Sequence, residues 1–134
     1  MSYLKTKYAD NLYVVFRIGI GVLFFMFGMQ KIFGLWGMPG GAVAFGTLIW
    51  FAGMGELLIG LGVTFGVLTR LASLFGVIEM LLAYLMGHVA VSGWNPAVNM
   101  GAPALLFMFA FFATFACGAK KASIELAMSK KEIF

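Results

Sequence analysis

The sequence predicts an all-α membrane protein: a single domain over residues 1–134, folded as an up-down bundle of four transmembrane helices. Composition, long apolar segments and short links predict this fold. Of the 134 residues, 63% are hydrophobic and only 10% are charged, whereas globular chains are about 45–50% apolar and about 25% charged. A small soluble domain needs a large polar surface, which so few charged residues cannot cover. The composition therefore excludes a soluble globule, a disordered segment and a nucleic-acid binder, and makes the lipid bilayer the expected partner.

Each predicted span is justified by its apolar length, because a helix needs roughly 20 apolar residues to cross a bilayer. Breaks in the apolar pattern separate the spans: Pro39-Gly40-Gly41 follows the first, Thr69-Arg70 separates the second from the third, and residues 92–96 precede the fourth. Such short links make consecutive helices antiparallel. The four spans are predicted at about residues 12–33, 44–68, 71–91 and 101–119.

The basic residues predict the orientation, because cytoplasmic loops carry an excess of lysine and arginine. Lys5 and Lys7 precede the first span, Arg70 lies between the second and third, and the links over 35–43 and 92–100 carry no charge. The lysines that follow the fourth span are Lys120, Lys121, Lys130 and Lys131. All basic segments lie on one side if there are four spans, so we expect a multi-pass plasma-membrane protein with both termini in the cytoplasm.

A few ionisable residues interrupt the apolar segments. A charge in hydrocarbon costs about 2.5 kcal/mol or more, so such residues usually face the bundle interior and find a partner. A helix rises about 1.5 Å per residue, and depths in the membrane estimated from this rise place Arg17, Glu56 and Glu79 in one layer. The long side chain of Arg17 can then reach at least one carboxylate. This layer is either a structural ion pair or a ligand- or proton-binding site, and Glu79 can equally be a protonated, hydrogen-bonded acid. Lys31 is expected to snorkel to the interface.

Helical spacing predicts which faces pack. Small residues at helical spacing allow close approach of two helices, and the ionisable residues share faces with such residues. The first stripe contains Arg17, Gly21, Phe24, Gly28 and Lys31, and the second contains Gly53, Glu56, Gly60 and Thr64. On the third span, Ala72, Gly76, Glu79, Ala83 and Ala90 form a similar face, and His88 points roughly opposite Glu79.

Several short stretches, in their order and spacing, are shared with one family. They are residues 17–19, 28–33, 53–60, 66–72, 104–106 and 118–125, together with His88. In these stretches the chain resembles the DoxX family of small integral membrane proteins. It departs from that family at Phe27 and Ala102, where many members have histidine and glutamate. The resemblance implies a four-helix membrane fold and, because one member is the membrane subunit of a thiosulfate:quinone oxidoreductase, a link to quinone chemistry.

We therefore expect a membrane subunit of a redox system that is associated with quinone. Arg17, Glu56 and Glu79 are the candidate catalytic residues, and Arg17, Glu56, Lys31 and His88 are candidates for binding quinone. Arg17 could donate to a quinone carbonyl, and Glu56 could relay a proton. Any oxidoreductase activity would need a redox partner subunit, and a homo-oligomer is the other expected assembly. One histidine and one cysteine at different depths predict no metal site.

Two other function classes stay open. One is a non-catalytic anchor or assembly module, because glycine-rich helix faces favour helix–helix contacts. The other is a small transporter or proton conduit that uses the intramembrane carboxylates.

Overall fold

All regular elements described by the computed structural model are helices. The structure describes residues 2–130, with side chains from residue 8 onward. Lys5, Lys7 and Lys131, which contribute to the predicted orientation, lie outside the described side chains. The elements are α1 (Ser2–Phe33), α2 (Leu48–Phe65), α3 (Thr69–Leu82), η1 (Ala83–Val89), α4 (Ala90–Ser92), α5 (Ala102–Cys117) and α6 (Ile124–Ser129). Because α3, η1 and α4 follow one another without a break, they form one long helix.

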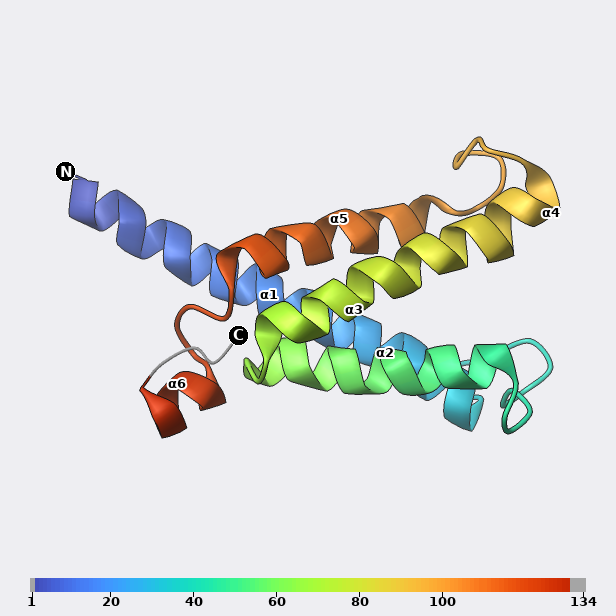
Figure 1. Ribbon diagram of the computed structural model, residues 1–134, viewed down its shortest axis with the longest axis horizontal. Coiled ribbons are helices and arrows are strands. Elements are labelled where there is room, and N and C mark those ends of the chain that lie inside the picture. The colour runs from blue at the N-terminus through green and yellow to red at the C-terminus, as the bar shows by residue number, and fades with distance from the viewer. Residues whose placement is uncertain (1, 131–134) are drawn as a thin grey trace.

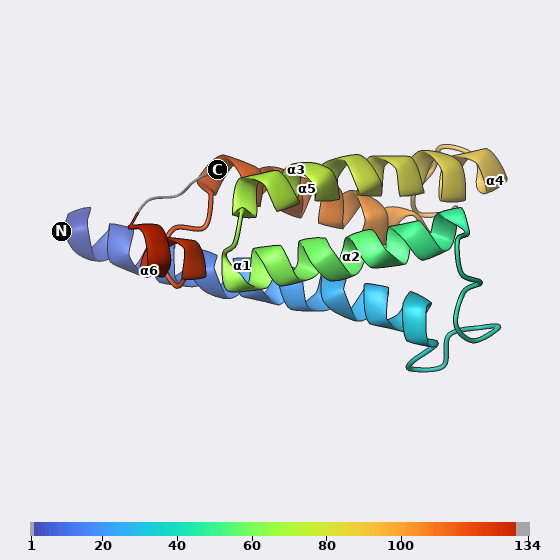
Figure 2. The same ribbon diagram turned by 60° about the horizontal axis from the view of Figure 1, so that its bottom comes forward.

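The long helices lie side by side in two layers, and consecutive helices run in opposite directions (Figure 1). α1 and α2 form one layer, and the α3–α4 helix and α5 form the other (Figure 2). Between the layers lies an apolar core that includes Phe24, Ile59, Val63, Val77 and Phe111. The first turns of α1 and the short helix α6 lie at one end of the molecule, and the two longer links lie at the other (Figure 1).

Three helical segments are long and apolar enough to cross a membrane: Tyr8–Phe33, Leu48–Phe65 and Thr69–Ser92. The fourth, α5, is apolar but has 16 residues, about 24 Å of helix against a hydrocarbon layer of about 30 Å. The all-α fold and the apolar helices are confirmed. The crossing by α5 and the sidedness of the termini stay predictions.

The link between α2 and α3 differs from the predicted one. α2 begins at Leu48, because the Thr47 hydroxyl caps it by accepting a hydrogen bond from the backbone N of Trp50 at 3.2 Å. It ends at Gly66, whose φ of 68° is left-handed. Thr69 and Arg70, predicted as the link, instead form the first turn of α3. The glycine therefore stops α2 three residues before its predicted end at 68.

Close packing of α1 on α2 depends on glycines at the contact. A Cβ added to Gly60 would lie 2.6 Å from the backbone N of Phe25 and 2.8 Å from the carbonyl O of Gly21. A Cβ added to Gly28 would lie 2.7 Å from the carbonyl O of Gly53. The two predicted stripes thus face each other, which confirms the packing faces read from the sequence.

The small-residue face predicted for the third span continues only as far as the π-helix η1. Gly76 is buried against the ring of Phe111 on α5, and a hydrogen bond of 2.7 Å joins Ser73 to Thr114. Beyond η1, Ala90 is exposed. A π-helix has more residues per turn than an α-helix, so η1 rotates the following residues off the predicted face.

Candidate functional site

Lys31 and Glu56 form an ion pair inside the bundle. The Lys31 Nζ donates to both Glu56 carboxylate oxygens, at 2.5 Å and 2.6 Å. Glu56 is 3% exposed, and the Lys31 amine also lies 5.7 Å from the centre of the Phe27 ring. The prediction that Lys31 snorkels to the interface is therefore wrong, because its amine turns inward to the carboxylate.

The local packing explains how the lysine reaches Glu56. α1 crosses α2 at Gly53, where an added Cβ would lie 3.1 Å from the Cβ of Lys31. The lysine stem therefore runs over Gly53, which has no side chain. Gly53 lies one turn before Glu56 on α2, so the lysine amine comes close to the carboxylate. Replacing the glycine by a larger residue would lift the stem away from the carboxylate.

Glu79 lies beside this ion pair, across the α2–α3 contact. A Cβ added to Gly55 would lie 2.8 Å from the Glu79 Oε2, and Glu79 is close enough to interact electrostatically with Glu56 and Lys31. Its Oε1 is buried and has no hydrogen-bond partner among the described residues. Lys31, Glu56 and Glu79 together are called the polar cluster below.

Arg17 lies elsewhere, at the end of the bundle where α6 docks. Its Nη1 donates to the carbonyl oxygens of Val63 (2.5 Å) and Thr64 (3.2 Å), and its Nη2 donates to that of Ala122 (2.7 Å). The sequence placed Arg17 in one layer with Glu56 and Glu79, within reach of a carboxylate, and for Glu56 this prediction is wrong. Glu56 lies seven residues before Val63, about 10 Å along α2, and its oxygens are held by Lys31. Arg17 instead binds the C-terminal end of α2 to the segment before α6.

Ser123 and Glu125 hold α6 against the α2–α3 link. The Ser123 hydroxyl donates to the Gly66 carbonyl O at 2.7 Å, and the Glu125 Oε2 accepts from the backbone N of Leu68 at 3.1 Å. The carboxylate thereby satisfies an amide at the start of α3 that has no side-chain cap of its own. The sequence interpretation missed this role. A serine followed by an acidic residue is a helix-start signal that could have indicated it.

A surface ion pair joins the same end of the molecule to α1. The Lys120 Nζ donates to the Asp10 Oδ1 at 2.8 Å, and this hydrogen bond raises the pKa of the Lys120 ammonium above its ordinary value. The Lys120 and Asp10 side chains are 37% and 25% exposed, so solvent screens much of the electrostatic energy of the pair.

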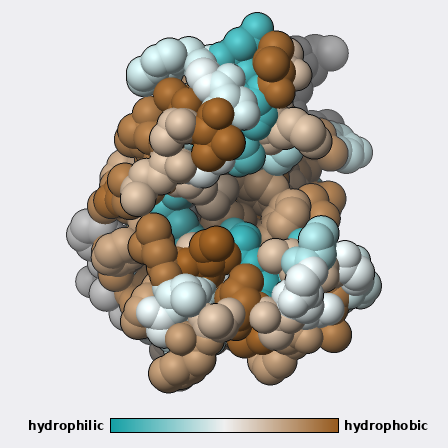
Figure 3. All heavy atoms as spheres, turned by 90° about the vertical axis from the view of Figure 1, so that its right-hand side faces the viewer, coloured by the Kyte–Doolittle hydropathy of each residue, from teal (hydrophilic) through white to brown (hydrophobic). Residues whose placement is uncertain are grey.

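His88 lies at the opposite end, in a second polar layer. Its Nδ1 donates to the carbonyl O of Asn99 at 2.9 Å, and the Tyr84 hydroxyl donates to that of Trp94 at 2.5 Å. The Asn99 side-chain amide donates to the Gly93 carbonyl O at 2.7 Å. Seen from this end, hydrophilic side chains lie between hydrophobic ones (Figure 3). These bonds fold the α4–α5 link over the bundle.

The structure thus brings together only part of the predicted site. Lys31, Glu56 and Glu79 share one cluster, in which Glu56 is buried and the other two are half-buried, whereas Arg17 and His88 lie at opposite ends of the bundle. Such a cluster offers an ammonium that can donate hydrogen bonds and carboxyl groups that can accept or carry a proton. It lies inside a bundle whose outer surface is apolar.

Comparison with curated proteins found no match, and neither did comparison with solved structures. A family comparison did find one: residues 12–89 match the DoxX family. This match covers more than half of the chain, from α1 to η1, and includes all three residues of the polar cluster. The chain therefore belongs to the DoxX family.

Proposed function

We propose that this DoxX-family membrane protein is a subunit of a redox system and that its polar cluster binds and protonates a quinone. One observation carries the proposal: a half-buried lysine pairs with a buried glutamate, beside a second glutamate whose Oε1 has no hydrogen-bond partner among the described residues. Intramembrane ionisable residues mark ligand or proton sites by default. A family match alone supports only the membrane fold.

The cluster offers what quinone chemistry requires from a protein. Reduction of a quinone to a quinol takes up two electrons and two protons at the carbonyl oxygens. In the proposed scheme, a redox partner subunit supplies the electrons. Glu79 gives one proton to a quinone oxygen, is reprotonated from the solvent side through Glu56, which Lys31 keeps oriented, and then gives the second proton, so that two electrons and two protons yield the quinol.

The proposed membrane arrangement has four crossings, with both termini in the cytoplasm. It is supported by the start of α3, which contains Arg70, and by the segment between α5 and α6, which contains Lys120 and Lys121, because both lie toward the end of the molecule where α1 begins (Figure 1). The uncharged links lie at the other end. Tryptophans favour the membrane interface, and Trp36 and Trp94 are both exposed at that end.

The experiment is to purify the protein in mild detergent, extract it and assay the extract for quinone. We expect bound quinone in the wild type and in Asp10→Asn, which changes only the ion pairs of Asp10 with Lys120 and Lys121 outside the cluster. We expect a loss of quinone-linked activity in Glu79→Gln. Absence of quinone in the wild type, together with unchanged activity in Glu79→Gln, would remove the proposal.

A second candidate function is an assembly module, in which the ion pair serves only folding. The observation that favours it is the lysine stem across Gly53, since such a contact fixes the register of α1 on α2. Exchanging the charges, as Lys31→Glu with Glu56→Lys, separates the two functions. An exchanged protein that accumulates normally but lacks activity supports chemistry at the cluster, and one that keeps full activity supports assembly.

A further inference from the structure

An apolar groove runs along the outside of the α2–α3 contact. Its volume is about 450 Å³, within the range of about 300–1,000 Å³ that ligand pockets occupy. It is lined on α2 by residues that include Leu58, Ile59 and Phe65, and on α3 by residues that include Leu71, Ala72 and Phe75. Every one of these side chains is apolar, so the groove itself fits a hydrocarbon chain.

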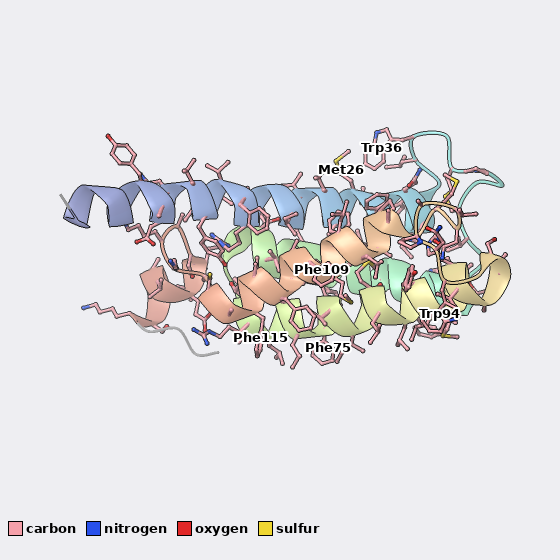
Figure 4. The ribbon with its side chains drawn as sticks, turned by 90° about the horizontal axis from the view of Figure 1, so that it is seen from above. Met26, Trp36, Phe75, Trp94, Phe109 and Phe115 are labelled. Carbon is pink, nitrogen blue, oxygen red and sulfur yellow. The ribbon has the colours of Figure 1, made fainter. Side chains whose placement is uncertain are left out.

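Small residues at the floor and large residues at the rims shape this groove. A Cβ added to Gly62 would lie 3.2 Å from the Cβ of Ala72, so the two helices touch at their smallest residues. Leu58 and Phe75 are exposed on either side, and Phe75 points outward from α3 (Figure 4). In a membrane these rims face lipid.

The groove leads toward the polar cluster. Gly55 lies one turn before Leu58 and Ile59 on α2, and Glu79 lies one turn after Phe75 on α3, so both continue the same helix faces. Glu79 packs on Gly55 there, and its Oε1 lacks a hydrogen-bond partner among the described residues. Glu79 therefore stands between the lipid-facing groove and the Lys31–Glu56 pair.

We propose that a prenyl-tailed quinone reaches the cluster from the bilayer between α2 and α3, with its tail in the groove and its head against Glu79. This inference rests on the proposed function and adds the site of the prenyl tail and the route by which the quinone enters. Glu79 lies ten residues after Thr69, about 15 Å along the helix. A phospholipid headgroup is charged and stays at the membrane surface, whereas an uncharged quinone head can sit at that depth. Depth thus selects a quinone over a phospholipid.

The test compares binding of tailed and tailless quinones to the purified full chain. The probes are ubiquinone and menaquinone, each paired with the same head group without its prenyl tail. Leu58→Trp fills the groove, and Leu106→Trp on α5 is the matched control, because Leu58 is 66% and Leu106 is 69% exposed. Thermal unfolding checks that both variants fold, and Phe75→Trp replaces Leu58→Trp if the latter does not.

We expect Leu58→Trp to weaken binding of a tailed quinone by about tenfold, since buried CH₂ groups lose their contacts, and to leave the tailless head unaffected. Leu106→Trp should bind both as the wild type does. Unchanged binding of the tailed quinone by Leu58→Trp would overturn the proposal that the tail lies in the groove, while leaving the proposed function in place. An equal loss of affinity for the tailed and tailless probes would have the same meaning. A wild type that binds none of the probes, or retains only phospholipid, would overturn both.

Discussion

At the scale of the single residue, the Lys31–Glu56 pair has the largest expected energetic effect. Glu56 is buried and both of its oxygens accept from Lys31. Lys31→Met would leave the buried Glu56 carboxylate without its partner. Breaking a fully buried pair costs about 3–5 kcal/mol, and because the Lys31 side chain is 24% exposed, we expect a loss of about 3 kcal/mol at most. Denaturant unfolding of the purified protein in detergent should show this loss as a lower free energy of unfolding than that of the wild type.

The control for that prediction removes both charges. Lys31→Met with Glu56→Gln leaves no uncompensated charge, so most of the stability should return. Lys120→Met, at the partly exposed and solvent-screened pair with Asp10, should unfold like the wild type. If the single and double variants were equally unstable, the cost would come from lost packing of the lysine stem.

Arg17 illustrates a different use of a buried charge, because its guanidinium binds backbone carbonyls on two segments. Arg17→Lys keeps the charge but loses the planar fork that reaches Val63 and Ala122 together. We expect the amides of α6 to exchange hydrogen about tenfold faster, which corresponds to a loss of about 1.4 kcal/mol. Exchange rates measured by mass spectrometry on the purified protein check this. Unchanged exchange in α6 would contradict the assigned role of Arg17.

The residue scale also marks where reasoning from the sequence stopped. The spacing of Arg17, Glu56 and Glu79 among small residues placed all three on faces that pack, and the structure has them there. The choice of partner was not predictable from depth alone. The partner of Arg17 depends on how far its side chain extends and on the backbone carbonyls near its guanidinium. Those carbonyls belong to the end of α2 and to the segment before α6.

At the scale of the element, the contact between α1 and α2 is set by the missing side chain of Gly60. Gly60→Ala would place a Cβ against the backbone of α1, so the helices must separate, at a cost of about 1–3 kcal/mol. Gly19→Ala is the matched control, because Gly19 has open space around it and alanine favours a helix by about 0.5–1 kcal/mol. We expect Gly60→Ala to lower the unfolding temperature and Gly19→Ala to raise it. Equal shifts in the two variants would contradict the close contact of α1 with α2 at Gly60.

The ends of the elements were harder to predict than their existence. Apolar length predicted each long helix, but Gly66 ended α2 early and Thr69 and Arg70 entered α3. The π-helix η1 carried no sequence signal that hydrophobic length could reveal. Local hydrogen bonds decide such features, and hydropathy does not report them.

At the scale of the whole molecule, the open prediction is the crossing by α5. Its 16 residues are short for a bilayer of about 30 Å, although local thinning accommodates such a mismatch. With Cys117 changed to serine, we would introduce Phe45→Cys, Val98→Cys or Lys121→Cys. A membrane-impermeant maleimide applied to intact cells should label the first two and spare the third. Labelling of both Val98→Cys and Lys121→Cys would show that α5 does not cross.

The sequence by itself determined the class of the protein: an apolar, helical membrane chain of the DoxX family, with packing faces marked by glycine and with a few charges inside those faces. These properties follow from composition and helical period, which are local. Only the tertiary structure decided that Lys31 rather than Arg17 pairs with Glu56, that Glu79 joins them, and that Arg17 with Ser123 and Glu125 holds α6. Those contacts join residues far apart in the chain, and their distances are set by how the helices cross, which no local pattern encodes.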